Sequence, residues 1–238
     1  MNKTPLVMCL TNYVAADFTA NALLAIGAKP AMVEEPSEAA ELAGIADAVL
    51  INLGTVHPRQ AEAMRSAIST STAISTSTSS LHLPTPWVLD PVACHLLSCR
   101  GGLAAEFVAK KPTLIRGNHA EIDYLRGTVP EMGTVPCLST GEVDRIWGTD
   151  PESKTGTVPL EICGGVPMLQ KVTATGCVQG AICAAFLGRG QSPLEAAEHA
   201  SRLMKCAGEL AWERTRTPGS FKSALIDALY HLSQDNQE

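Results

Sequence analysis

The chain has 238 residues, enough for one large domain or two small ones, and its 45% hydrophobic content is enough for a large core. Aromatic residues make up only 4%, so the core must be built from Ala, Leu, Ile and Val, which suits packed helices and a covered parallel sheet. A net charge of −6 without a long basic run argues against nucleic acid as the main partner and against binding to a membrane surface.

The cysteine pattern argues against a disulfide framework and against structural zinc. Eight cysteines occur, at positions 9, 94, 99, 137, 163, 177, 183 and 206, and no pair has CxxC spacing. Free thiols in a reducing cytoplasm are the better interpretation. The N-terminus lacks a basic start followed by an apolar run, so export is not expected. No segment reaches about 18 unbroken apolar residues, so a membrane span is not expected either.

Short apolar runs alternate with helical patterns along the first half of the chain. Strands are expected at 5–11, 31–33, 48–53 and 87–90, with helices at 17–26, 36–43 and 58–69 and another that opens near Arg100. This alternation indicates a parallel sheet with crossover helices. The low-complexity segment Ser69–Ser80 is expected to be a mobile surface loop, because serine and threonine lose little by staying solvated.

Two asparagines lie in or beside the turn after the first expected strand. Asn12 directly follows Thr11, and Asn21 lies in the helical pattern Asp17–Ile26, which Gly27 ends. Both side chains are able to orient a ligand by hydrogen bonds. Helix capping and turn chemistry explain the same residues without a ligand, and both interpretations stay open.

An aspartate lies at the end of the apolar run Trp87–Leu89. Asp90 follows three apolar residues, and Pro91 ends the strand. A carboxylate at the carboxyl end of a parallel strand faces the crevice in which open α/β sheets bind ligands. Asp90 is therefore a candidate for holding Mg²⁺ through water or for contacting a reacting hydroxyl. The alternative is a helix-capping or turn aspartate.

The next strand pattern is also followed by polar side chains. Arg116, Asn118 and Glu121 come directly after the buried run Thr113–Ile115. An arginine pairs with phosphate through a bidentate fork, whereas a glutamate and an asparagine order the water shell of Mg²⁺. The spacing of Asn118 and Glu121 is also that of a capping box, and the two roles are compatible.

The remaining elements of the second half of the chain are predicted from their local patterns alone. We expect a strand at 135–139, a turn at 140–144, a polar loop at 150–157, and helices at 192–215 and 220–233.

The stretch Lys171–Gly188 carries the clearest sign of chemistry. A short polar loop ends at Gly176, and small apolar residues then recur at helical spacing, so Gly176 and Cys177 lie where a loop becomes a helix. The first amide groups of a helix lack partners and favour anions. The same field lowers the pKa of a thiol, so we expect Cys177 to be more acidic than a free cysteine. A buried helix that happens to begin with a cysteine is the alternative.

Six segments, in this order along nearly the whole chain, resemble those of hydroxyethylthiazole kinases. They are LTNYVAADFTANALLAIGAKPAM, AVLINLGT, WVLDPVA, LIRGNHAEI, STGEVDRI and VPMLQKVTATGC. The resemblance implies a ribokinase-like fold: a single three-layer α/β/α domain over residues 1–238 with a central, mostly parallel sheet. It also implies transfer of the γ-phosphate of ATP to the hydroxyethyl group of 4-methyl-5-(2-hydroxyethyl)thiazole, a salvage step towards thiamine. Family members are Mg²⁺-dependent homotrimers with active sites between subunits.

The resemblance assigns three residues to the thiazole. Met32 in GAKPAM matches the methionine that lines the pocket, and Asn12 matches the asparagine of the TN pair nearby. Ala174 takes the place of a glycine that often contacts the thiazole.

The resemblance assigns a second set to ATP and the metal ion. Arg116 of IRGN and Thr140 of TGEVD match nucleotide contacts, and we group the neighbouring Asn118 with them. Asp90 and Glu121 match the acidic pair around Mg²⁺ and the phosphates. Phosphoryl transfer then depends mostly on positioning and on neutralisation of charge.

Two further residues are expected to act in catalysis beside Asp90. The amide of Gly176 and its neighbours would hold the γ-phosphate and its developing charge. Cys177 matches the cysteine found where many ribokinase-like relatives carry an aspartate base, so it is expected to act as a weak base or as an orienting group.

Several positions depart from the family pattern. Met8 stands where the family commonly has histidine, and Cys94-His95-Leu96 replace Gly and small residues after DPVA. Bulk in that loop is expected to weaken ATP binding. The region at 150–157 is longer than is typical.

Three alternatives remain open. The first is a kinase of the same fold acting on another small alcohol, such as a hydroxymethylpyrimidine. The second is a cysteine-nucleophile enzyme that uses Cys177 with a histidine such as His119. The third is a non-catalytic thiazole- or thiamine-binding protein, which the altered loop after Pro91 suggests.

Overall fold

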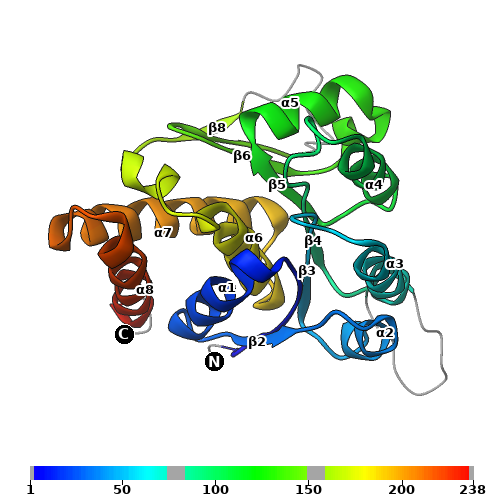
Figure 1. The fold of residues 1–238 in the computed structure, drawn as a ribbon, viewed down its shortest axis with the longest axis horizontal. Coiled ribbons are helices and arrows are strands. Elements are labelled where there is room, and N and C mark those ends of the chain that lie inside the picture. Colours follow the sequence, from blue (N-terminus) through cyan, green and yellow to red (C-terminus); the bar gives the residue numbers. More distant parts are fainter. Residues whose placement is uncertain (1–2, 74–83, 149–158, 236–238) are drawn as a thin grey trace.

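The computed structural model describes residues 3–73, 84–148 and 159–235, and Figure 1 shows how their helices and strands are arranged. The described strands are β1 (Leu6–Leu10), β2 (Lys29–Met32), β3 (Ala48–Asn52), β4 (Trp87–Asp90), β5 (Leu114–Asn118), β6 (Cys137–Thr140), β7 (Asp144–Trp147) and β8 (Leu160–Ile162). The described α-helices are α1 (Tyr13–Ala25), α2 (Pro36–Ala43), α3 (Pro58–Thr72), α4 (Ser98–Val108), α5 (His119–Thr128), α6 (Thr175–Gly188), α7 (Pro193–Arg214) and α8 (Pro218–Asp235). Two short 3₁₀ helices are η1 (Pro130–Thr134) and η2 (Pro167–Gln170).

All of these strands form one sheet, in the order β2-β1-β3-β4-β5-β6-β7-β8. Strands β1 to β6 pair in parallel, whereas β7 and β8 pair antiparallel at one edge. Parallel neighbours need crossover connections, and helices α1 to α5 supply them in turn. The expected mostly parallel sheet is confirmed.

Helices cover both faces of the sheet (Figure 1). One buried core joins α1, α6, α7 and α8 to the face on which Cys9 and Leu50 lie. The other joins α2, α3, α4 and α5 to the face on which Met8 and Ile51 lie. Neighbouring strand residues point to opposite faces, so strands covered on both sides are apolar throughout. This arrangement confirms the three-layer α/β/α fold.

Two helices differ in extent from the sequence expectation. Helix α1 begins at Tyr13, earlier than expected, because the side chain of Asn12 accepts a hydrogen bond from Ala15 N and caps it. Helix α3 continues to Thr72, into the serine- and threonine-rich segment. Residues 74–80 of that segment and the expected loop at 150–157 lie outside the described residues.

Strands β7 and β8 were not predicted from the sequence. Both are short, and β8 has two exposed residues out of three, so neither shows the apolar run of a covered strand. They form because β6 offers an edge on which an antiparallel pair extends the sheet.

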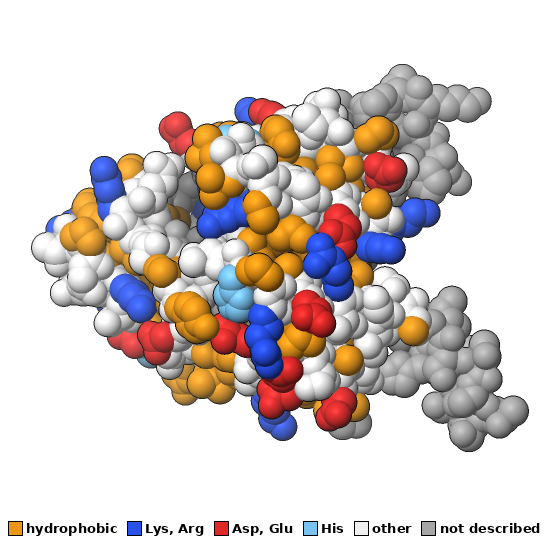
Figure 2. All heavy atoms as spheres, turned by 45° about the vertical axis from the view of Figure 1, so that its right-hand side comes forward, with side chains coloured by type: hydrophobic (Ala, Val, Ile, Leu, Met, Phe, Trp, Pro, Cys, Tyr) orange, Lys and Arg blue, Asp and Glu red, His pale blue; other side chains and the backbone are white. Residues whose placement is uncertain are grey.

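Surface charges of both signs are interspersed on the side of the molecule that carries α2, α3 and α4, which Figure 2 brings forward. Ion pairs join these helices: Arg59 of α3 contacts Glu35, and Arg65 of α3 contacts Glu106 of α4 at 2.7 Å. Such exposed pairs contribute little to stability individually. No described helix is both long enough and apolar enough to cross a bilayer.

The sheet has a topological switch between β1 and β3. The chain crosses from β1 to β2 on one side and later returns to β3 on the other, so the connections at the carboxyl ends of β1 and β3 diverge. A crevice opens outside the carboxyl ends of the strands at such a point, and open α/β sheets bind ligands there.

Candidate active site

The carboxyl ends of five adjacent parallel strands each carry a buried polar residue. These are Asn12 directly after β1, Asn52 in β3, Asp90 in β4, Arg116 in β5 and Thr140 in β6. Because parallel strands end at the same edge of a sheet, side chains far apart in the sequence meet there.

Two asparagines begin a hydrogen-bond chain along this edge. Asn12 Nδ2 donates to Asn52 Oδ1 at 3.1 Å, and Asn52 Nδ2 donates to Asp90 Oδ2 at 2.9 Å. Gly54 lies so close that a Cβ on it would stand 2.3 Å from Asn12 Nδ2. Asn12 therefore serves as the helix cap and also faces the site, so both interpretations of this residue apply.

Asp90 is fully buried, and its Oδ1 atom has no hydrogen-bond partner. Burial raises the pKa of this carboxyl to about 7, against the opposing effect of the Arg116 guanidinium, and the nearby Glu121 raises it further. An unpaired buried carboxylate oxygen is costly. Asp90 therefore presents a free acceptor to whatever occupies the site.

Arg116 is held by contacts on several sides. Its Nη2 donates to Thr140 Oγ1 at 2.6 Å and to Gln179 Oε1 at 3.3 Å, and its Nη1 lies 3.7 Å from Asp90 Oδ2. A Cβ on Gly176 would stand 2.5 Å from Nη1, so the guanidinium packs against the first turn of α6. The structure therefore brings Asp90, Arg116, Thr140 and Gly176 together.

Cys177 is placed beside Asn12, with its sulfur 3.9 Å from Asn12 Nδ2. The expectation of an acidic thiol is wrong, because burial, with a further contribution from the Asp90 charge, raises the pKa of Cys177 to about 11. Desolvation outweighs the opposing effects of Asn52, Arg116 and Asn12, which lower this pKa. His119 binds Ser139 Oγ through Nδ1 at 2.6 Å, and no described contact joins it to Cys177. This geometry disfavours a Cys177–His119 nucleophile.

Asn118 and Glu121 form the expected capping box at the start of α5. Glu121 Oε1 also accepts from Ala93 N at 2.7 Å, so this carboxylate ties the loop after β4 to α5. That loop holds the altered residues: Cys94 is buried, whereas the side chain of Leu96 is 72% exposed. The bulk of Leu96 therefore lies in solvent, and the loop contributes none of the described residues that line a cavity beside Arg116.

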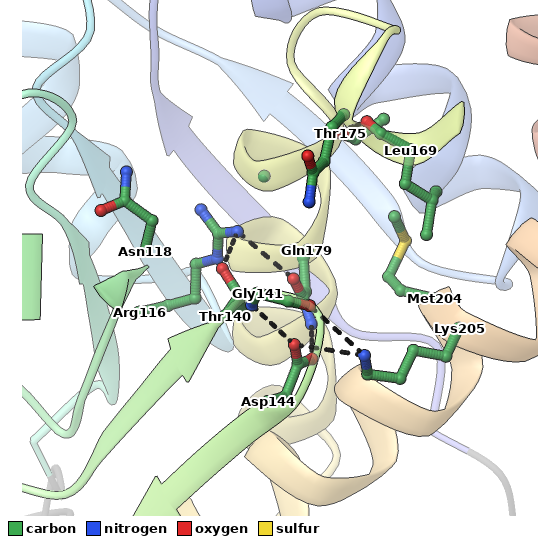
Figure 3. A pocket seen from close by; sticks show the side chains of 12 residues that line it. Arg116, Asn118, Thr140, Gly141, Asp144, Leu169, Thr175, Gln179, Met204 and Lys205 are labelled. Carbon is green, nitrogen blue, oxygen red and sulfur yellow. Dashed lines mark hydrogen bonds and ion pairs between the residues drawn. The ribbon is translucent and has the colours of Figure 1, made fainter. Parts of the chain in front are cut away.

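A cavity of about 280 Å³ lies beside Arg116. Figure 3 shows the side chains around it, which come from β5, β6, the following turn, β7, η2, α6 and α7. The polar part of the lining includes Arg116, Asn118, Thr140, Asp144, Thr175, Gln179 and Lys205, together with Gly176 at the start of α6. Arginine, a helix start and backbone amides are groups that bind phosphate.

Three further residues for which the sequence suggested contact with a ligand lie away from this cavity. Met32 ends the edge strand β2 and is 39% exposed. Ala174 precedes α6 with a positive φ of 68° and has no place in the cavity lining. Asn21 bonds to Asp17 within its own helix on the exposed surface, so it does not orient a ligand at the strand ends.

Sequence reasoning missed three buried polar residues of the site and gave Asp144 no role beyond the turn. Asn52 was hidden inside an apolar strand, and its only signal was an amide in a run that is otherwise hydrophobic. Gln179, inside the apolar helix α6, donates to Asp144 Oδ2 at 3.3 Å, and Lys205 of α7 lies 3.5 Å from Asp144 Oδ1. Only the packing of α6 and α7 against the sheet reveals these partners.

The described residues contain no group of three or more His, Cys, Asp and Glu side chains able to hold a metal ion. Mg²⁺ keeps several of its waters and needs only one or two carboxylates. The unpaired Oδ1 of Asp90, with Glu121 close enough to affect its pKa, fits such a water-mediated ion.

Comparison with solved structures supports the class to which this fold and site belong. The structure of a hydroxyethylthiazole kinase from Pyrococcus horikoshii is similar with a TM-score of 0.84 and 31% identity, covering 96% of this chain and 88% of that one. A ribokinase-like superfamily protein from Enterococcus faecalis shares the fold with a TM-score of 0.65 and 14% identity, covering 96% of this chain and 87% of that one. The molecule therefore has a ribokinase-like α/β fold with a polar site at the carboxyl edge of its sheet.

The sequence comparisons narrow this class to one family. The family model "HK: Hydroxyethylthiazole kinase family" matches residues 1–136 and 131–235. The hydroxyethylthiazole kinase from Corynebacterium efficiens is 41% identical, in an alignment that covers 98% of this chain and 90% of that one. The hydroxyethylthiazole kinase from Serratia proteamaculans is 37% identical, with 98% of this chain and 91% of that one covered. The chain belongs to the hydroxyethylthiazole kinase family, which confirms the resemblance and the expectation of a kinase.

Proposed function

We propose that this protein transfers the γ-phosphate of ATP to the hydroxyethyl group of 4-methyl-5-(2-hydroxyethyl)thiazole, in thiamine salvage. The observation that carries the proposal is the buried row of polar residues at the strand ends, centred on Asp90 with its unpaired oxygen, in a chain of this family. The oxygen of the alcohol attacks the γ-phosphorus while the bond to the departing ADP breaks, and the hydroxyl proton is released to water.

ATP belongs in the cavity beside Arg116. Arg116 and the first amides of α6, at Gly176 and Cys177, offset the phosphate charge. Thr140 holds the guanidinium at 2.6 Å, and Asn118 lines the same cavity. Buried cations and amides that are already oriented stabilise developing charge without reorganising.

The thiazole alcohol belongs on the other side of Asp90, towards Asn12 and Cys177. A thiol whose pKa is about 11 stays protonated at neutral pH, so Cys177 orients the hydroxyl rather than removing its proton. The free Oδ1 of Asp90 accepts from the reacting hydroxyl or from a water bound to Mg²⁺. Asp90 and Glu121 would hold Mg²⁺ through water, and the ion would supply neutralisation of the phosphate charge.

The active unit we propose is a homotrimer in the cytoplasm with sites between subunits. Tyr13 and Val14, which directly follow Asn12, are 71% and 60% exposed, and Met32 is 39% exposed. Large apolar side chains exposed beside a polar site favour an interface there. A neighbouring subunit would then bury Met32 and Ala174 against the thiazole.

Formation of the thiazole phosphate with MgATP tests the proposal. Wild-type protein is expected to form product, Asp90→Ala to lose at least about a hundredfold in kcat, and Cys177→Ala to lose about tenfold or less because the thiol only orients the substrate. Product from Asp90→Ala at the wild-type rate would contradict the assigned role of Asp90. Saturable thiazole binding without any product would overturn the kinase and favour a binding protein.

A panel of small alcohols separates the thiazole kinase from a kinase of the same fold with another acceptor. The expected result is the highest kcat/KM with the thiazole alcohol. A higher value with a hydroxymethylpyrimidine would reassign the substrate and leave the chemistry unchanged.

A further inference from the structure

A stripe of three polar side chains on α7 contacts two loops: one lines the cavity, and the other leads into η2, which also lines it. Ser201, Lys205 and Glu209 are spaced by four residues and therefore lie on one face of the helix. The loops are the turn at 140–144, which carries Thr140, and the loop at 163–166, which leads into η2.

Lys205 is at the centre of this stripe and is only 5% exposed. Its Nζ donates to the carbonyl oxygens of Glu142 at 3.1 Å and Gly164 at 3.0 Å, with Gly141 O at 3.5 Å. It also lies 3.5 Å from Asp144 Oδ1. An ammonium has three N–H donors, and these four oxygens leave none of them for a phosphate. Lys205 therefore lines the cavity without being free to bind an anion.

The two flanking residues fix the same two loops. Ser201 Oγ donates to Asp144 Oδ2 at 2.6 Å, and Glu209 Oε1 accepts from Gly165 N at 2.6 Å. Gly164 and Gly165 have positive φ values of 103° and 81°, which glycine adopts readily. A loop made of such residues has little conformational preference of its own, so its shape depends on these outside contacts.

The network continues to the arginine of the site (Figure 3). Asp144 Oδ2 also accepts from Gln179 Nε2 at 3.3 Å, and Gln179 Oε1 accepts from Arg116 Nη2 at 3.3 Å. Without the Lys205 ammonium, Asp144 would be a buried carboxylate without its cation, which is unfavourable. Asp144 and its partners would then rearrange, and Arg116 would lose one of its supports.

We propose that Lys205 is a positioning residue, an internal cation that joins the two loops and, through Asp144 and Gln179, orients Arg116 for the nucleotide. This inference rests on the proposed function only in taking the cavity as the nucleotide site. A buried ammonium surrounded by carbonyl and carboxylate oxygens is replaceable by a small free ammonium ion of the same chemistry once its own stem is removed.

The experiment compares Lys205→Ala with Lys205→Met. Lys205→Ala leaves a space beside the oxygens, whereas Lys205→Met fills that space without charge. Both are expected to raise the Kd of a non-hydrolysable ATP analogue, measured by calorimetry, by about tenfold or more, the loss typical of a buried charge-assisted contact. The KM for ATP should rise more than kcat falls. Methylammonium is expected to restore tighter binding to Lys205→Ala and not to Lys205→Met.

Arg202→Ala is the matched control, because Arg202 lies on the exposed surface of the same helix and pairs only with Glu198 among its described contacts. It should leave the Kd of the analogue at the wild-type value. Wild-type affinity in a folded Lys205→Ala variant would overturn the proposal. So would weakened binding that methylammonium leaves unchanged, since a merely structural loss is not rescued by a cation.

Ser201→Ala keeps the test decisive if Lys205→Ala does not fold. It removes one hydrogen bond to Asp144 and leaves the ammonium in place, so a rise of about threefold in the Kd is expected, and an unchanged Kd would overturn the proposal. The binding measurement also separates the two proposals. Wild-type protein that binds the analogue but does not phosphorylate the thiazole would contradict the proposed function and leave the test of Lys205 valid.

Discussion

Asp90 is under two opposing influences that the structure makes visible. Complete burial favours its neutral form, whereas Arg116 at 3.7 Å and the amide of Asn52 at 2.9 Å favour the carboxylate. Burial prevails, and the pKa rises to about 7. A group balanced near neutrality changes charge readily when Mg²⁺ or phosphate arrives, which suits a phosphoryl-transfer site.

This raised pKa predicts how the stability of the protein depends on pH. A folded-state pKa above the ordinary value of 3.8 gives a stabilising contribution that is complete below that value and lost as pH rises through about 7. Asp90→Asn removes this titration. Without magnesium, the free energy of unfolding of the variant relative to wild type should therefore increase by roughly 2 to 3 kcal/mol between pH 5 and pH 8. Urea unfolding at the two pH values measures this difference.

Asp123→Asn, at an exposed position of α5, is the control for pH effects that do not depend on burial. A difference between Asp90→Asn and wild type that stays constant from pH 5 to pH 8 would contradict the raised pKa.

Cys177 illustrates the same competition in a thiol. Its pKa of about 11 predicts a thiolate fraction on the order of one in several thousand at pH 7.5. Iodoacetamide should therefore label Cys177 far more slowly than the exposed cysteines Cys99, Cys163 and Cys206. Mass spectrometry of peptides from briefly treated protein measures the order. Preferential labelling of Cys177 would show that the helix N-terminus outweighs desolvation.

Helix α6 lies close to the strand ends because its residues there are small. A Cβ on Gly176 would stand 2.5 Å from Arg116 Nη1, and one on Gly180 would stand 3.4 Å from Asp90 Oδ2. The glycines therefore bring the start of α6 into contact with the two charged residues of the site. Close approach, rather than conformational freedom, explains glycine at these positions.

Gly176→Ala tests this contact at the level of the element. The added methyl group should displace the Arg116 guanidinium and raise the KM for ATP by about tenfold or more, with little change in thermal stability. Gly102→Ala is the matched control, since no atom lies within 4 Å of the added Cβ in helix α4. That change should leave the KM unaltered and stabilise the protein by roughly 0.5–1 kcal/mol. Equal KM values for both variants would contradict the contact.

At the scale of the whole molecule, some large apolar side chains remain exposed near the polar residues at the carboxyl ends of the strands. Tyr13 and Val14 begin α1 directly after Asn12, and the hydroxyl of Tyr13 donates to Glu34 just beyond β2 at 3.0 Å. The start of α1 and the end of β2 therefore lie side by side. This surface is the one that the proposed trimer would cover.

Val14→Asp tests the proposed assembly. Wild-type protein is expected to sediment with a mass near three times 25.0 kDa. The variant should shift towards the single-chain mass and lose activity with it, because a buried unpaired carboxylate in the interface is unfavourable. Ile45→Asp, at a position that is 72% exposed away from this surface, is the control. A trimer unaffected by Val14→Asp would place the interface elsewhere, and a wild-type monomer would contradict the trimer.

The sequence by itself determined the fold class, the crossover elements of the parallel sheet and several residues of the site. Strands covered on both faces are short apolar runs, and helices have a different period, so both are visible in local order. The polar residues that follow those runs, Asp90 and Arg116 among them, were found because strand ends face the crevice of an open sheet. The capping box at Asn118 and Glu121 was also predictable, because it depends only on the spacing of two residues that are near in sequence.

Only the tertiary structure decided the partners of these residues. The contact between Asn12 and Cys177 joins positions 165 residues apart. Gln179, Asp144 and Lys205 meet because α7 packs against both α6 and β7, a strand without a local signal. Burial, and with it the high pKa of Cys177, also arises only when distant elements exclude water together. Periodicity records which way a residue faces along its own element, whereas desolvation and hydrogen bonding depend on what other elements place opposite it.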